Sequence, residues 1–147
     1  MACFIAYLAW RAQKTHNRVS VTPIPEVKFE DLKDQITVAL ENVGVGPMRM
    51  LSLRVLQDGV ERFDALHKAT SLKSCEWFVD NIDRRHVGQM RQIVLLRFAR
   101  DPMQAGADIG VLRLELSRLE IALVYTDVYG TRFDAYRRSL EWFGRHG

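Results

Sequence analysis

The feature that most constrains this fold is a series of short segments in which apolar and polar side chains alternate. In QITVALEN every second residue from Ile36 to Leu40 is a large aliphatic residue, with threonine and alanine between them. Successive side chains of a strand point to opposite faces, so this period of two predicts a half-buried strand. The same pattern predicts strands in LEIALVYTD and in MRMLSLRVLQ, where Leu51, Leu53 and Val55 form the buried face.

Turn residues separate these segments. Asp58-Gly59 is typical of a two-residue hairpin turn, and NVGVGP is predicted to be a bulge or loop between two strands. Residues 11–26 are predicted to be a linker that becomes extended in VSVTPIPEV, because its prolines remove backbone donors and suit an edge strand. After the turn TDVYGT, the segment RFDAYRRSL is predicted to return as the last partner strand.

Two segments change to a helical period. In FDALHKATSLKSCEWFVDNI the apolar residues recur at steps of three or four, which predicts a helix over residues 64–81 with Asp64 as its N-cap. A second helix is predicted from about Ala107 to Arg118, although the leucines between residues 112 and 116 suit a strand equally well. Between the two helices, QIVLLRF is predicted to be a strand buried on both faces. These elements predict a mainly β (α+β) fold, a small antiparallel immunoglobulin-like β-sandwich with one or two inserted helices.

The opening stretch MACFIAYLAWRAQKTHNR is apolar as far as Trp10 and basic afterwards. It is shorter than the roughly 20 apolar residues that cross a bilayer, and its charges follow the apolar part, which is the reverse of a signal peptide. The aromatic residues near its charged end suit a membrane interface. We therefore expect a truncated or minimal membrane anchor with its basic flank at residues 1–18 and a soluble β-rich domain at residues 19–147. The alternative is a helix end that packs on the domain.

The positive charge of the chain belongs to this N-terminal stretch. The net charge is +3, and Arg11, Lys14 and Arg18 all precede the first acidic residue, Glu26. Without these three, the 21 basic residues fall to 18, which balance the 18 acidic residues over positions 19–147. A neutral domain argues against a broad nucleic-acid footprint, so no nucleic-acid partner is expected. The basic flank predicts an inner-membrane, single-pass protein whose domain faces the cytoplasm.

Motifs that carry chemistry are missing from the sequence. NVGVGP lacks the third glycine of a dinucleotide-binding loop, and neither a P-loop nor a nucleophile elbow occurs. The four histidines lack the spacing of a zinc site, and Cys3 and Cys75 do not form a disulfide framework. Cys75 is predicted to be a buried, inert thiol, and Asp127 to serve the TDVYGT turn. We therefore expect no enzyme activity, no cofactor, and no catalytic, cofactor-binding or metal-binding residue.

The C-terminal stretch is dense in aromatic residues and arginines, which predicts either of two roles. Such residues form a surface that stacks bases or binds a partner, or they pack as cross-strand pairs with the arginines on the wet face. In the second case Trp142 would cover an open edge of the sandwich. The predicted interaction surface consists of Tyr129, Arg132, Tyr136, Arg138 and Trp142.

The chain also resembles a known group of proteins. The apolar run ending A-W-R, then V-T-P, N-x-G-x-G-P, Y-T-D-V-Y-G and S-L-E-W-F-G-R-H are similar to segments of uncharacterised small bacterial membrane proteins. The resemblance implies one N-terminal transmembrane helix and a β-rich domain, and it implies no activity. The present apolar run has only half the length of such an anchor.

These observations predict a membrane-tethered, non-catalytic interaction or structural domain. Its expected partners are a membrane, through the N-terminus, and a protein. The alternative is a small-molecule sensor that binds its ligand in a cleft between the sheet and the helix at 64–81, where Arg84, Arg85 and His86 would converge with aromatic residues.

Overall fold

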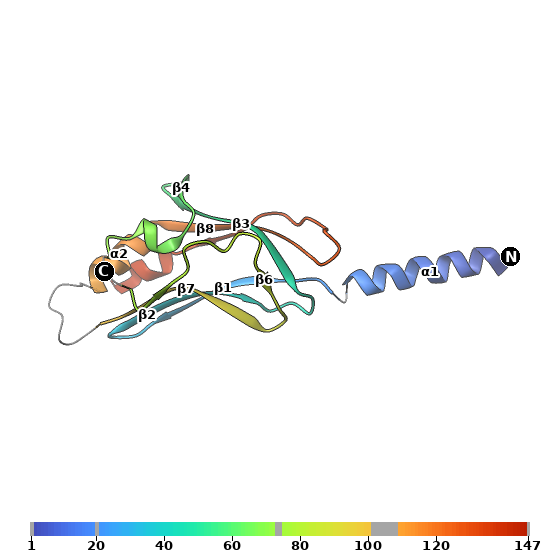
Figure 1. The fold of residues 1–147 in the computed structure, drawn as a ribbon, viewed down its shortest axis with the longest axis horizontal. Helices are drawn as coiled ribbons and strands as arrows, with labels where there is room; N and C mark the ends of the chain where they lie inside the picture. The colour runs from blue at the N-terminus through green and yellow to red at the C-terminus, as the bar shows by residue number, and fades with distance from the viewer. Residues whose placement is uncertain (1, 20, 73–74, 101–108, 147) are drawn as a thin grey trace.

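The computed structural model describes residues 2–19, 21–72, 75–100 and 109–146. In this part of the chain, helix α1 precedes a domain of short strands with a second helix and two 3₁₀ turns (Figure 1). The elements are α1 (Ala2–Val19), β1 (Pro25–Asp31), β2 (Gln35–Asn42), β3 (Met48–Gln57), β4 (Val60–Phe63), η1 (Leu66–Ala69), β5 (Trp77–Phe78), β6 (His86–Val87), β7 (Arg91–Ala99), α2 (Ile109–Leu116), β8 (Leu119–Thr126), β9 (Tyr136–Ser139) and η2 (Glu141–His146).

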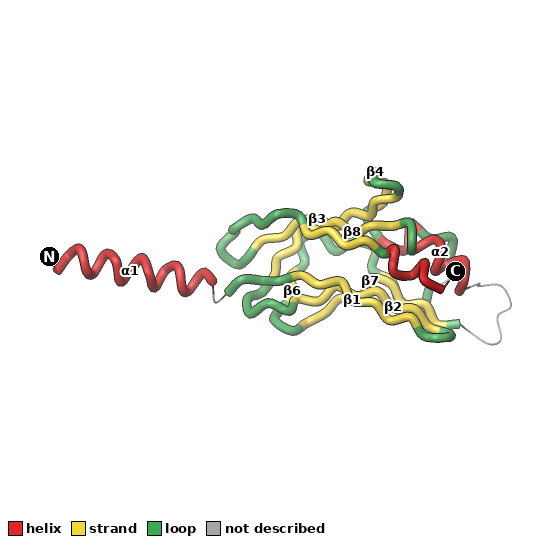
Figure 2. The backbone as a smooth tube through the Cα atoms, turned by 180° about the vertical axis from the view of Figure 1, so that it is seen from behind, coloured by secondary structure: helices red, strands yellow, loops and turns green. Residues whose placement is uncertain are grey.

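The strands form two antiparallel sheets that face each other across one core, as in a β-sandwich (Figure 2). One sheet has the order β1-β2-β7-β5, and the other has the order β4-β3-β8-β9 with β6 paired to β3. Aliphatic side chains of both sheets fill the space between them, among them Ile36, Leu40, Met50, Val55, Leu96, Ile121 and Leu123. The predicted mainly β, antiparallel fold is therefore confirmed.

Strand alternation places most of these residues, with two differences in detail. β2 is buried on both faces, because Thr37 and Ala39 are covered as well as the aliphatic residues between which they lie. In β3 the pairing with β8 shifts register between Met50 and Ser52. This irregularity leaves Leu51 only half-buried and puts Met50 in the core, so the predicted face of β3 is wrong at its start.

Two turn predictions are confirmed. Asp58 and Gly59 both have positive φ, 53° and 77°, and they join β3 to β4 in a hairpin. NVGVGP is a loop between β2 and β3, in which the buried side chain of Asn42 accepts the N–H of Gly44 and donates to the carbonyl of Gly46. A Cβ at Gly46 would overlap the backbone of Val21, so glycine is required there for close approach of two chain segments.

The helix predicted over residues 64–81 is wrong. The segment contains the 3₁₀ turn η1 and then β5, which pairs with β7, and residues 73–74 lie outside the described part. Asp64 is not an N-cap, because its carboxylate pairs with Lys68 instead. The Thr70 hydroxyl donates to the carbonyl of His67, the kind of local bond that competes with a helix.

Helix α2 confirms the second helical prediction and excludes the strand alternative there; residues 107 and 108, at the predicted start, lie outside the described residues. Its Leu112 and Leu116 are fully buried. Arg113 binds both carboxylate oxygens of Asp31, with Nη2–Oδ1 at 2.7 Å, and the Asp31 side chain is 1% exposed. This bidentate ion pair fixes α2 to the end of β1.

The C-terminal segment closes one side of the sandwich. β9 is shorter than the predicted partner strand and pairs with β8 only from Tyr136 to Ser139. The Tyr136 hydroxyl accepts the N–H of Val27 at 3.1 Å, which links the edges of the two sheets. Phe143 in η2 is fully buried beside Phe29.

The N-terminal segment corrects two expectations. α1 runs to Val19, so residues 11–19 are helical rather than part of an extended linker. Within the described residues, no helix combines the length and the apolar character needed to cross a bilayer. The predicted transmembrane anchor, and with it the single-pass inner-membrane location, is therefore wrong.

Candidate binding surface

The sandwich has two ends of different construction. The first, which we call the loop end, carries the connections at residues 43–47, 88–90 and 127–135. The second, the closed end, carries α2, η2 and the β3–β4 hairpin. Figure 1 shows α1 extending away from the loop end, whereas the C-terminus lies at the closed end.

A row of paired residues crosses the outer face of one sheet at the loop end. The pairing places His86 opposite Arg49, Arg49 opposite Thr126, and Thr126 opposite Arg132. Residues directly opposite each other share a face of the sheet, and the neighbours Met48 and Met50 point into the core. His86 and both arginines are exposed, so the row presents them to solvent.

Three more arginines lie close to this row. Arg84 and Arg85 form backbone hydrogen bonds with Met50, which follows Arg49 in β3, at 2.9 Å each. Arg91 begins β7 opposite Asn42 and is exposed. Among the described residues, no carboxylate forms an ion pair with any of the five arginines of the loop end, Arg49, Arg84, Arg85, Arg91 and Arg132.

Two of the nearby carboxylates are committed to local contacts, whereas those of Glu26 and Asp134 are exposed. Asp127 is 3% exposed, and its Oδ1 accepts the N–H groups of Tyr129 and Thr131 at 2.8 Å each. Glu41 pairs with Lys28, and this hydrogen bond raises the pKa of the Lys28 amine. The loop end therefore has a local excess of positive charge, although the domain as a whole is neutral.

Helix α1 exposes large apolar side chains in the half that lies farther from this end (Figure 1). The five are Phe4, Ile5, Tyr7, Leu8 and Trp10, each 47–67% exposed. Lys14 lies over the Trp10 ring at 5.0 Å. A groove of about 530 Å³ lies between the following part of α1 and the loop end, and it is lined by Trp10, Gln13, Lys14, Asn17 and Tyr129.

The five predicted interaction residues do not form one surface. Tyr129 and Arg132 are exposed at the loop end. Arg138 lies over the ring of Phe29 at 5.2 Å, and Trp142 contacts the same ring at 5.8 Å. Tyr136 is occupied by its bond to Val27. Sequence reasoning missed Arg49 and Arg91, because only the sheet register brings Arg49 into the row with Arg132 and places Arg91 at the same end of the other sheet.

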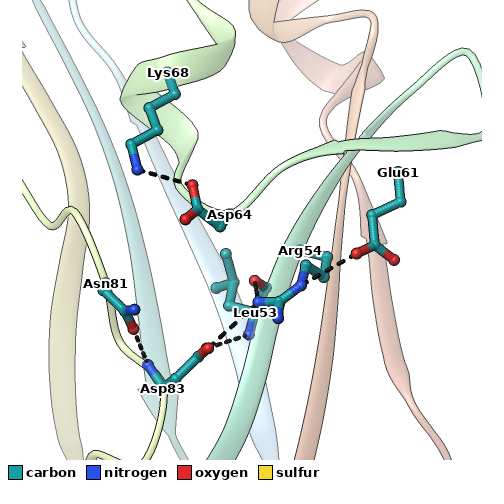
Figure 3. A network of polar contacts seen from close by, with 7 residues as sticks. All are labelled: Leu53, Arg54, Glu61, Asp64, Lys68, Asn81 and Asp83. Carbon is teal, nitrogen blue, oxygen red and sulfur yellow. Dashed lines mark hydrogen bonds and ion pairs between the residues drawn. The ribbon is translucent and has the colours of Figure 1, made fainter.

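The segment predicted to border a ligand cleft is fastened to the sheet by polar contacts, which Figure 3 shows. Asp83 accepts the Leu53 N–H at 3.2 Å and lies 3.5 Å from Arg54, which also pairs with Glu61 at 3.1 Å. The neighbouring Arg84, Arg85 and His86 are exposed at the loop end. The described part of residues 64–81 contains a 3₁₀ turn and a short strand in place of the helix over which these residues were expected to converge. The ligand-binding hypothesis stays a prediction.

The other groups with reactive or metal-binding chemistry are the thiol of Cys75 and the histidine and acidic side chains. Burial raises the pKa of the Cys75 thiol, which leaves less of the nucleophilic thiolate at neutral pH. Among the residues that the structure describes, no three histidine, cysteine or acidic side chains are grouped so as to hold a metal ion.

Comparison of the chain with protein-family models and with curated proteins finds no match. The functional argument therefore rests on the chemistry of the loop end.

Proposed function

We propose that this protein is a non-catalytic binding domain that takes up an anionic partner at its loop end. The observation that carries this proposal is the group of five exposed arginines without ion-pair partners among the described residues. Like charges that lie close together repel each other, so the group does not stabilise the domain by itself. An anionic partner supplies the missing countercharge.

We also propose that the sandwich is of the immunoglobulin-like type. The order β1-β2-β7-β5 corresponds to strands A-B-E-D of that fold, and β4-β3-β8-β9 corresponds to C′-C-F-G. The β2–β3 and β8–β9 connections of the loop end then take the positions of the B–C and F–G loops, which bind antigen in antibodies. The chain differs from antibody domains in its free cysteines and in the insertion of α2 between the E and F strands.

We propose that the resemblance to small bacterial membrane proteins extends to the sheet domain alone. It is supported by the loop position of N-x-G-x-G-P and by the turn position of Y-T-D-V-Y-G, both at the loop end. We propose a common sandwich, and the transmembrane helix of that group is not carried over.

Heparin, a soluble polyanion, provides a direct test of the proposed function. The double variant Arg49→Gln/Arg132→Gln is expected to elute from a heparin column at lower salt than wild type, because counterion release scales with the number of cations engaged. The matched control is Arg62→Gln/Arg118→Gln, which removes two exposed arginines from the closed end. Equal elution of the two variants would contradict a localised anion-binding surface.

A further inference from the structure

We propose that the anionic partner is a lipid surface, and that α1 and the loop end bind it together without α1 crossing the bilayer. This inference rests on the proposed function, because it names the class of partner that the loop end takes. Three features of α1 and its position carry it: the distribution of apolar side chains, the basic residues that follow them, and the direction in which the helix leaves the domain.

The apolar part of α1 is apolar around its whole circumference. Successive helical residues are turned by about 100°, so Phe4, Ile5, Tyr7, Leu8 and Trp10 spread over about 220° of the circumference, and the remaining sector carries only alanines. All five are exposed. A groove on a protein contacts one face of a helix, as in recognition of amphipathic helices. Lipid surrounds an inserted segment on every side, so it covers all five side chains.

The apolar part of α1 ends where basic residues begin. No charged residue lies from Ala2 to Trp10, so this part suits the hydrocarbon of a leaflet. Arg11 and Lys14 follow at the level of the headgroups, where long basic side chains reach phosphate oxygens. Tyr7 and Trp10 lie near the same boundary, as interfacial aromatic residues do.

The geometry of the chain brings the loop end toward the same surface. The N-terminus of α1 points away from the sandwich and the loop end faces α1 (Figures 1 and 2). Insertion of the N-terminal half therefore turns the exposed arginines of the loop end toward the headgroups. Helix α1 contains no acidic residue, because the first one in the chain is Glu26. Both α1 and the loop end therefore carry an excess of positive charge. A negatively charged leaflet is complementary to both.

Flotation with lipid vesicles tests the inference on the full chain. Wild type is expected to float with vesicles of phosphatidylcholine mixed with phosphatidylserine, and much less with phosphatidylcholine alone. The Arg49→Gln/Arg132→Gln variant is expected to lose about fivefold in vesicle affinity for each cation removed, with an unchanged melting temperature. The closed-end control Arg62→Gln/Arg118→Gln is expected to bind like wild type. Phe4→Gln/Leu8→Gln is expected to stay unbound.

The outcomes separate this inference from the proposed function. If wild type does not bind the mixed vesicles but the two arginine variants still elute from heparin at different salt concentrations, the lipid inference is wrong and the proposed function stands. If the heparin contrast is absent too, both are wrong. Binding to vesicles that survives Phe4→Gln/Leu8→Gln would overturn the role of α1. A dimer in ultracentrifugation that this variant abolishes, with no vesicle binding by wild type, would assign the apolar surface to a second copy of the chain.

Discussion

The two ends of the sandwich use arginine in opposite ways. At the closed end Arg113 is held by both oxygens of Asp31, and Arg137 lies 3.3 Å from Glu120 in the adjoining strand. At the loop end Arg49 and Arg132 flank Thr126 in a row that contains no carboxylate. The two ends therefore carry the same type of charged residue and belong to the same pair of sheets.

The difference concerns what each charge contributes to the folded chain. A buried carboxylate such as that of Asp31 requires a partner, because an unpaired charge away from water is strongly destabilising. An exposed arginine is well hydrated and has little effect on the free energy of unfolding. At the closed end Arg113 therefore contributes to stability, although Arg62 and Arg118 are exposed there as well. The five arginines of the loop end are grouped together and remain available for an anionic partner. The predictions below test this contrast, beginning with the largest expected effect.

Removal of the aromatic ring at the centre of the closed end is expected to have the largest effect. Phe143 is fully buried and packs on Phe29 and Trp142, with ring centroids 5.4 and 5.2 Å away. Phe143→Ala should lower the free energy of unfolding by about 3–5 kcal/mol. Trp142→Ala should cost less, because Trp142 is only half-buried. Urea unfolding measures the loss in both variants. A larger loss for Trp142→Ala than for Phe143→Ala would contradict the view that Phe143 is the central side chain of the closed end.

Identical substitutions at the two ends should give different results. Arg113→Gln leaves the Asp31 carboxylate without its bidentate partner, and we expect a loss of about 1.5–3 kcal/mol in the free energy of unfolding. Arg49→Gln removes an exposed side chain with no ion pair among the described residues, so its effect should stay within about 0.5 kcal/mol. Thermal melts of the two variants compare them directly. Similar losses would remove the distinction between the ends.

The smallest effect is expected at Asp127. Asparagine offers the same Oδ1 acceptor to the N–H groups of Tyr129 and Thr131, so Asp127→Asn should change the free energy of unfolding by less than about 0.5 kcal/mol. Because the substitution removes a negative charge from the loop end, retention on heparin should increase slightly. Weaker retention than wild type would mean that the carboxylate itself takes part in binding.

Much of the fold could be predicted because strand alternation and turn residues act locally. Asp58-Gly59 forms a hairpin turn between the strands that flank it. The alternating residues Ile36, Val38 and Leu40 lie on one face of their strand, and that face is buried in the core. The segment after β4 shows where this reasoning fails. Its apolar residues do pack against the core, as a helical period implied, but they do so from a 3₁₀ turn and from the irregular segments around the short strand β5. The periodicity correctly predicted which residues of this segment pack against the core, but it predicted the wrong backbone conformation.

The candidate site was harder to predict because it is built by pairing between distant segments. Arg49 and Arg132 are 83 positions apart, as the difference between 132 and 49 gives, and only the strand register brings them into one row. Arg84 joins them through its backbone hydrogen bond to Met50, and Arg91 comes from the other sheet. A charge count over the whole domain gives neutrality and conceals this segregation. The apolar run was identified correctly, but its composition did not reveal that the helix continues through the basic residues to Val19.

Amide hydrogen exchange of the full chain, with and without phosphatidylserine-containing vesicles, tests the contrast between the two ends most directly. We predict slower exchange on vesicles in α1 and in the loop-end connections at residues 43–47, 88–90 and 127–135, with no change in α2 or η2. Slower exchange confined to α2 and η2, or exchange at the loop end that vesicles leave unaltered, would contradict the account.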